Sequence, residues 1–542
     1  RKISVASDTW SSANPGKYML VGGDQVTIQD VTLDGGGVAA GCLQFFKARG
    51  GSFQGFVTLK NARGLGLNIN ASQVTAEGIL TLKGNGWGDI INVSWGSNVS
   101  GVDRCFFDGS AAALEGVAAV YTDHSDVRNA GGDLEKFSIL LPASFAAASE
   151  GELSALGKAI LYAPAAAEVE GTGYLSLAGA FQAAPDGSTI TLRASSAGNG
   201  TISLSDGREL ILDLNGFDVG FAQGQTLQVT NADLTLTGRG KLYEQQPQSA
   251  PVTLLGSDSP HAEGHSTLTV GRDVTLEGWS GVWIGPGEEG ENAFGVSAAI
   301  YGTVISSAGG DGGHAVHLSG SMSSEAGNVP QLRLEGATLM APGGTGLYLG
   351  GYAQTTVNSS SIRAEAGGTG VVLSAGELAI LGNTVVTGGS GSLETVPSGD
   401  GSDAAHVALA VVQRSEAMPV VLTVTGGDFT GSGALLEQNA QNGDPAAAAK
   451  VNIDISGGRF HGQVYSENQT GFISGGTFTV HPGPYLVDGF AAEDSGDPVY
   501  HYTVTAAGQN PAQVIAGEAA VSVSDAVSEE EAQALAQQVA QA

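Results

Sequence analysis

The sequence predicts an all-β fold, a right-handed parallel β-helix in which short strands stack coil upon coil. Three observations predict it. Glycine accounts for 84 of the 542 residues, with no Gly-X-Y period, which is roughly twice the average fraction of about 7 %. A six-residue pattern with an apolar residue at each end recurs along the chain. A second pattern, small–apolar–x–apolar, is interleaved with the first.

The six-residue pattern predicts one strand with its corner in each coil. The copies that begin at Leu334 and Val357 are 23 residues apart, and glycine pairs within the copies suit tight corners. The copies are Val229–Leu234, Ile300–Ile305, Leu334–Leu339, Val357–Ile362, Ile380–Val385, Val424–Phe429, Ile455–Phe460 and Ile473–Phe478. Because side chains alternate along a strand, we expect an inward set that includes Leu234, Ile305, Leu334, Leu339, Val357, Ile362, Ile380 and Phe460.

The second pattern predicts another strand of the same coils. Its copies are Gly281–Ile284, Ala315–Leu318, Gly346–Leu349 and Gly370–Leu373. Two strand sets in one period mean one coil with at least two sheet faces. The third residue of each copy points outward, and coils stack about 4.8 Å apart. We therefore expect one outer stripe, joined by Trp279 and made of Trp283, His317, Tyr348 and Val372.

Composition shifts divide the chain into four parts. Residues 1–141 form a first β-helical segment, with similar strands 23 to 26 residues apart. Residues 142–170 form an Ala-rich connector that we expect to be partly helical, because Leu153, Leu156, Ile160 and Leu161 are near helical spacing. Residues 171–505 form the main β-helix with an N-terminal capping helix. Residues 506–542 form a tail that ends in a helix.

Charge and cysteine content exclude several classes of protein. The net charge of −32 repels phosphate backbones and excludes nucleic acid as a partner, although divalent cations such as Ca²⁺ suit an acidic surface. The sequence contains no apolar run of about 18 residues, so we expect no segment that inserts into a membrane. The only cysteines, Cys42 and Cys105, are expected to be buried free thiols, and a bond between them stays open.

Several segments resemble pectate-lyase-like β-helix modules in large surface proteins of gut Firmicutes. The resemblance covers most of residues 20–505, and its segments are Asn85–Val93, Ala180–Leu192, Leu212–Gly216, the Ser-Gly-Gly-Thr-Phe copies and Tyr485–Phe490. It implies an extracellular protein, secreted or on the bacterial cell surface. It leaves the activity open, because the fold hosts lyases, hydrolases, adhesins and phage tailspikes.

The sequence carries one weak catalytic candidate. Val120–Arg128 resembles the Ile-Asp-His strand of pectate lyases and contains Asp123, His124 and Arg128. The Arg-x-Pro-x-x-Arg segment of those enzymes is absent, and so are the Gly-His-Gly and Arg-Ile-Lys of polygalacturonases. We therefore expect no enzyme, with a polysaccharide lyase or a glycoside hydrolase of the β-helix type as the alternative.

Histidines give no expected metal site. His314 and His317 are three residues apart on an expected strand, so we expect them on opposite faces. His261 and His265 lie in a loop with Asp258, and we interpret that loop as a polar insertion.

The outer stripe remains as the candidate binding site. Exposed aromatic rings stack on sugars or pack on a partner protein, so Trp283, His317, Tyr348 and Trp279 predict an adhesin or binding module for a host or dietary glycan or a host surface protein. The competing interpretation is that an insertion covers the stripe, for instance the acidic loop Gly285–Asn292. A structural stalk or self-assembling appendage is the further alternative.

Overall fold

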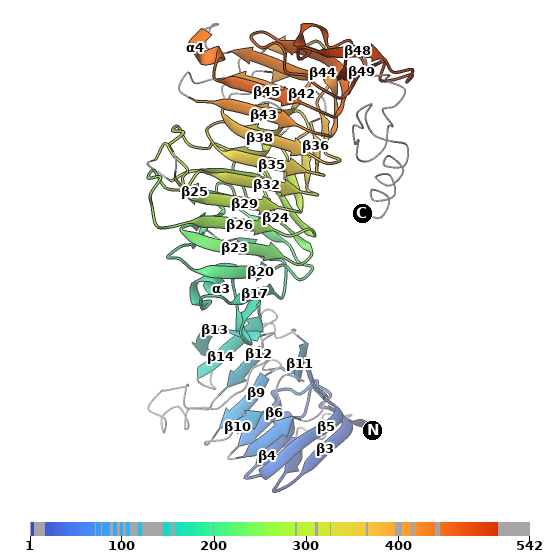
Figure 1. Cartoon of the computed structure of the whole chain (residues 1–542). Helices are drawn as coiled ribbons and strands as arrows, with labels where there is room; N and C mark the ends of the chain where they lie inside the picture. Colours follow the sequence, from blue (N-terminus) through green and yellow to red (C-terminus); the bar gives the residue numbers. More distant parts are fainter. Residues whose placement is uncertain are drawn as a thin grey trace, which may run out of the picture. The chain divides into compact units, whose positions relative to one another are not determined.

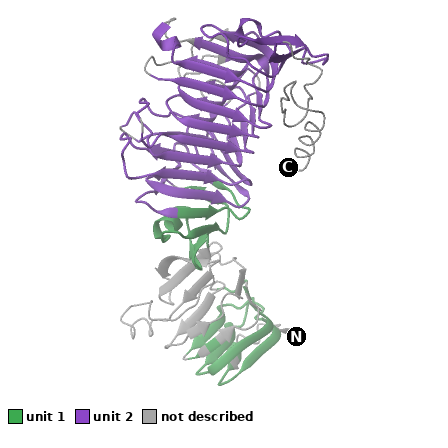
Figure 2. Ribbon diagram, in the orientation of Figure 1, with its two compact units in different colours: residues 1–199, 210–219 green, residues 200–209, 220–542 purple. Residues whose placement is uncertain are grey.

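The structure, a computed structural model, places the chain in two compact units (Figure 2). Unit 1 holds residues 1–199 and 210–219, and unit 2 holds residues 200–209 and 220–542. The division into four parts stays a prediction. The structure describes residues 2–4, 17–70, 72–76, 79–86, 90–94, 98–100, 105–108, 118–121, 145–152, 158–198, 200–287, 290–308, 313–325, 327–364, 367–395, 404–413, 418–439 and 445–507.

Unit 2 is a parallel β-helix in which each coil contributes three strands (Figure 1). The first row of parallel strands is β23 (Ala232–Thr237), β26 (Ser266–Val270), β29 (Val296–Ile300), β32 (Gln331–Glu335), β35 (Gln354–Asn358), β38 (Gly376–Leu381), β43 (Val420–Val424) and β45 (Val451–Ile455). The second row is β24 (Gly240–Glu244), β27 (Val274–Gly278), β30 (Thr303–Ser306), β33 (Thr338–Met340), β36 (Ser361–Arg363) and β39 (Val385–Thr387).

The third row of unit 2 carries the outer stripe. It is β22 (Leu227–Thr230), β25 (Val252–Gly256), β28 (Val282–Pro286), β31 (His314–Leu318), β34 (Thr345–Leu349), β37 (Thr369–Leu373) and β42 (Val407–Gln413). The long strands β44 (Asp428–Asn439) and β46 (Arg459–Ser466) follow; β44 pairs with both β39 and β42. An antiparallel set follows, made of β47 (Thr477–Phe478), β48 (Phe490–Asp494) and β49 (Tyr502–Ala506). Smaller elements are β19 (Ile202–Leu204), β21 (Val219–Phe221), β40 (Glu394–Thr395), β41 (Ala404–Ala405), α4 (Pro445–Ala448) and η3 (Gly483–Tyr485).

Unit 1 also consists mainly of parallel strands in two sheets. One sheet contains β1 (Lys2–Ser4), β3 (Thr27–Asp34), β5 (Arg49–Lys60), β7 (Gln73–Ala76), β8 (Ile79–Lys83), β10 (Asn98–Ser100) and β11 (Cys105–Asp108). The other contains β2 (Tyr18–Gly22), β4 (Gly41–Phe46), β6 (Leu65–Asn70), β9 (Ile90–Ser94), β12 (Ala118–Tyr121), β13 (Phe145–Glu152) and β14 (Lys158–Pro164). Its last elements are β15 (Ala167–Val169), β16 (Thr172–Tyr174), α3 (Leu177–Ala183), β17 (Thr189–Leu192), β18 (Ser196–Gly198) and β20 (Glu209–Asp213).

The Ala-rich segment after residue 142 corrects one expectation. Its described residues form strands rather than a helix, because β13 and β14 pair antiparallel and β14 also pairs with β12. Cross-strand pairing thus overrides the helical propensity of alanine. The predicted tail helix lies outside the described residues. Among the described residues, no helix is long and apolar enough to cross a membrane.

The core of unit 2 consists of the inward ends of the repeated pattern. Seven of the eight predicted inward residues, all but Ile305, are no more than 1 % exposed. Ile305 is half-buried, and its neighbour Val304 occupies the core slot opposite Leu339. Val385 is likewise 39 % exposed while Val386 is fully buried. The rings of Phe429, Phe460 and Phe478 stack inside, with centroids 4.8 Å apart.

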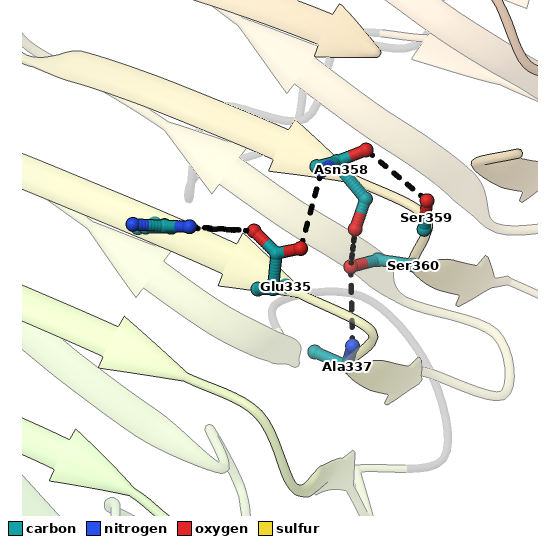
Figure 3. A network of polar contacts seen from close by, with 6 residues as sticks. Glu335, Ala337, Asn358, Ser359 and Ser360 are labelled. Carbon is teal, nitrogen blue, oxygen red and sulfur yellow. Dashed lines mark hydrogen bonds and ion pairs between the residues drawn. The ribbon is translucent and has the colours of Figure 1, made fainter. Parts of the chain in front are cut away.

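Polar side chains join successive coils at the corner after β35 (Figure 3). Asn358 Nδ2 donates to Glu335 Oε1 at 3.2 Å, across neighbouring strands. Ser360 Oγ donates to the Asn358 carbonyl at 2.9 Å and accepts the Ala337 N–H at 3.1 Å. Ser359 occupies the left-handed region with a φ of 48°. The corner is therefore fixed by hydrogen bonds that run both along the chain and between coils.

A candidate aromatic binding site beside stacked loops

Three aromatic side chains of the predicted stripe occupy equivalent positions on β28, β31 and β34. Trp283 pairs with His317, and His317 pairs with Tyr348. The Trp283 and His317 rings are stacked with centroids 6.0 Å apart and an interplanar angle of 19°. The His317 and Tyr348 centroids are 4.9 Å apart. The structure therefore brings these three side chains together as a ladder of rings, which we call the aromatic ladder.

Small residues two positions later make room for the rings. A Cβ added at Gly285 would lie 2.4 Å from the Trp283 ring, and one at Gly350 would lie 2.8 Å from the Tyr348 ring. Residues i and i+2 share a face of a strand, so the rings of Trp283 and Tyr348 each lean along their own strand over a glycine. His317 has Ser319 at that position, and its Nε2 lies 3.0 Å from Ser319 Oγ.

Exposure differs along the ladder. Trp283 and His317 are half-buried, but Tyr348 is only 7 % exposed and Val372 is fully buried. Tyr348 and Val372 form a buried cluster with residues of β42 and β44, and Leu393 packs against this cluster. Leu393 belongs to the segment between β39 and β42. The expectation of an exposed stripe therefore fails from Tyr348 onward, and the covering segment differs from the acidic loop considered in the sequence.

Long loops follow the strands that carry the exposed part of the ladder. The loops after β25, β28 and β31 span residues 257–265, 287–295 and 319–330. The loops after β34 and β37 span only residues 350–353 and 374–375. Insertions in a solenoid gather where one face is used for binding.

These three loops, which we call the loop cluster, bind one another through hydrogen bonds. Ser257 and Phe294 exchange two backbone hydrogen bonds of 2.9 Å. Asn328 Nδ2 donates to the Ala262 carbonyl at 2.8 Å, which ties the third loop to the first. Asp258 Oδ1 accepts the N–H groups of Asn292 and Glu291, which holds the pKa of Asp258 below its usual value. The loop cluster is thus a cross-linked surface beside the aromatic ladder.

Trp279 lies at the corner before β28 and is 37 % exposed. Its carbonyl accepts a 2.6 Å hydrogen bond from Ser306 Oγ of the next coil. Its backbone N–H donates to the buried Glu244 carboxylate at 3.5 Å. The same carboxylate also accepts the backbone N–H of Ser249 at 2.8 Å. Coils on both sides therefore hold the backbone of an exposed ring. Sequence reasoning missed Glu244, whose only signal was a lone carboxylate at the end of a strand.

The two histidines of β31 correct a second expectation. His314 and His317 lie together rather than on opposite faces: their Nδ1 atoms are 3.1 Å apart and their ring centroids 4.8 Å apart. His314 also lies 4.7 Å from the Tyr348 ring and is 2 % exposed. It is the first residue of its strand, next to the corner glycine Gly313, and strict alternation of side chains holds only within a strand.

The remaining candidates are the residues of one catalytic segment and of one polar loop. Asp123, His124 and Arg128, the catalytic segment, lie outside the described residues. His261, His265 and Asp258 are exposed in the first loop of the loop cluster. Within the described ranges, no group of three or more His, Cys, Asp or Glu side chains is placed to hold a metal ion.

Comparison of the chain with family models, curated proteins and solved structures finds no match. The β-helix architecture therefore rests on the strand pairing described above, and the resemblance to surface modules rests on the sequence segments alone.

Proposed function

We propose that this chain is a binding module of a secreted or surface-displayed bacterial protein, an adhesin that recognises glycans. The observation that carries the proposal is that the long loops follow the strands bearing Thr253, Trp283 and His317, beside the exposed part of the aromatic ladder. The resemblance to surface modules of gut Firmicutes supports the same context.

Trp279 and Trp283 are the side chains we assign to ligand contact. Both are on one coil and both retain exposed surface. Buried Val282 and Ile284 flank Trp283 on its strand, and hydrogen bonds to neighbouring coils hold the backbone of Trp279 at its corner. An aromatic ring contributes about 0.5–1.5 kcal/mol through stacking beyond its buried area. Two rings give weak affinity for a single site, which suits attachment through many copies.

Charge narrows the ligand to a neutral glycan. Residues 257–265, 287–295 and 319–330 contain no Lys or Arg, while Asp258, Glu263, Glu291 and Glu325 are exposed there. An acidic polysaccharide would place its carboxylates near these acids without a cation to pair with. This argues against the lyase alternative, whose substrates are acidic polysaccharides.

The strands that follow β46 argue against a stalk that grows by adding parallel coils at this position. Among the described residues, β49 pairs antiparallel with both β47 and β48, and β47 continues the sheet from β46. An antiparallel set covers the strand edge to which a further parallel coil would be added.

The test is an array of neutral and acidic glycans probed with the full chain and with Trp279→Ala, Trp283→Ala and the double variant. The control is Tyr465→Ala, which removes a 42 % exposed ring from β46. We expect each single variant to weaken binding to a neutral glycan about 2- to 10-fold, as follows from the stacking energy. The control should bind like the parent. Equal binding by the double variant, or turnover of an acidic glycan, would overturn the proposal.

A further inference from the structure

The paired histidines of β31 have a geometry that the glycan proposal does not use. The Nδ1 atoms of His314 and His317 face each other at 3.1 Å. We propose that these two side chains form a binding site for a divalent transition-metal ion, Cu²⁺, Ni²⁺ or Zn²⁺.

The distance between the two nitrogens suits chelation. Imidazole nitrogens bind zinc at about 2.0–2.1 Å, so two nitrogens 3.1 Å apart subtend an angle of roughly 100° at the ion. That angle lies between the ligand–metal–ligand angles of square-planar and tetrahedral coordination. Without metal, the same atoms share a proton in an N–H···N hydrogen bond, and the ion takes the place of that proton.

Neighbouring groups hold both rings in this orientation. His317 Nε2 lies 3.0 Å from Ser319 Oγ, the type of contact through which metal-binding histidines are oriented by their second ring nitrogen. The Tyr348 ring lies 4.7 Å from His314 and 4.9 Å from His317, and Trp283 stacks on the other side of His317. Little side-chain freedom is therefore lost when an ion binds.

Ligand type and charge select the ion. Imidazole suits zinc, copper and nickel rather than calcium or magnesium, which prefer oxygen ligands. His317 is half-buried and gives access, whereas His314 is buried. The exposed acids of the loop cluster and the net charge of −32 raise the local concentration of cations. Two protein ligands leave the remaining coordination positions to water, so affinity is moderate and copper binds most tightly.

The experiment uses the full chain without an affinity tag. One equivalent of Cu²⁺ is added, binding is measured by calorimetry, and the electron paramagnetic resonance spectrum reports the nitrogen atoms bound to copper. We expect one site with two imidazole nitrogens, and quenching of tryptophan fluorescence that Trp283→Phe reduces. His317→Asn should weaken Cu²⁺ binding at least tenfold and remove one nitrogen from the spectrum.

The matched control is His261→Asn with His265→Asn, which removes two exposed histidines from the nearby loop. This variant should bind like the parent. Full-strength binding by His317→Asn, or loss of binding in the control instead, would overturn the site. If His317→Asn does not fold, the two measurements on the unmodified chain decide the test. A spectrum with no imidazole nitrogen bound to copper, or calorimetry with no saturable site, rejects the proposal. None of these outcomes depends on whether a glycan binds.

Discussion

At the scale of single residues, the aromatic ladder combines two environments. Trp283 keeps part of its surface in solvent, whereas Tyr348, two strands further along, is 7 % exposed beneath a covering segment. The same outward position on the sheet is therefore partly exposed to solvent at one end and buried by packing at the other. Leu393, which packs against the cluster that contains Tyr348, comes 45 residues after Tyr348 in the sequence.

Truncation of the two rings should separate these roles. We expect Tyr348→Ala to lower the free energy of unfolding by about 2–4 kcal/mol, because it leaves a cavity among Val372, Val407 and Leu436. Trp283→Ala should cost less than half as much, since its ring is partly solvated. Urea unfolding of both variants measures this. Equal losses would mean that Trp283 is as deeply packed as Tyr348.

The register of the ladder was predictable from the sequence, but its exposure was not. Alternation of side chains assigned Trp283, His317 and Tyr348 to one face, and their ring contacts agree with this. A signal for the tilt of the rings was present in Trp-Ile-Gly285, His-Leu-Ser319 and Tyr-Leu-Gly350, where a small residue follows two positions later. The cover over Tyr348 depends on tertiary packing, which a local pattern does not contain.

At the scale of strands and corners, corner length decides which residue enters the core. The sequence pattern predicts Ile305 as an inward residue because five positions separate the apolar ends in all eight copies. The corner at Gly302 is one residue shorter, since only four positions separate Ile300 from Val304, and Val304 takes the core slot. A slip of one residue reverses the face of every following side chain. Strand identity was therefore predictable, but the exact inward residue was not.

Corners also contain strain that a substitution can relieve. Gly336, Ser359 and Gly382 follow three paired strands and have φ values of 61°, 48° and 61°. A left-handed residue with a Cβ costs about 1–2 kcal/mol, so Ser359→Gly should raise the free energy of unfolding by about 0.5–1 kcal/mol after the loss of chain entropy. The urea midpoint measures this.

The matched substitution is Gly382→Ala, in the next coil. A Cβ there would lie 2.4 Å from Asn358 Oδ1, so this variant should lose stability. An unchanged or lower midpoint for Ser359→Gly would show that its hydrogen bond to Asn358 outweighs the backbone strain.

At the scale of the whole molecule, a buried thiol and several tyrosine hydroxyls have raised pKa values, which bear on the stability of the fold in alkali. Burial raises the pKa of the Cys42 thiol to about 11 and that of the Tyr18 hydroxyl to about 12. Burial also raises the pKa of Tyr352 and Tyr500 in unit 2. Cys42 is a free, buried thiol whose Sγ donates to the Lys60 carbonyl at 3.3 Å, as expected from the sequence. The side chain of Cys105 lies outside the described residues.

These raised pKa values predict that the chain loses stability in alkali. Each group is neutral in the folded state and ionises more readily when unfolded, so its contribution is complete below the unfolded pKa of 9.0 for Cys42 or 10.0 for Tyr18. The contribution falls as the pH rises toward about 11 and about 12, because the unfolded state then binds fewer protons than the folded state. A raised pKa of about two units for Tyr18 corresponds to a loss of up to about 3 kcal/mol in the free energy of unfolding.

Urea unfolding between pH 8 and pH 11.5 measures this loss. Tyr18→Phe should make stability fall less steeply with pH, because phenylalanine has no hydroxyl. The exposed Tyr465→Phe serves as the control and should follow the parent; a Tyr18→Phe curve as steep as the parent's would show that Tyr18 is not a source of the alkaline instability.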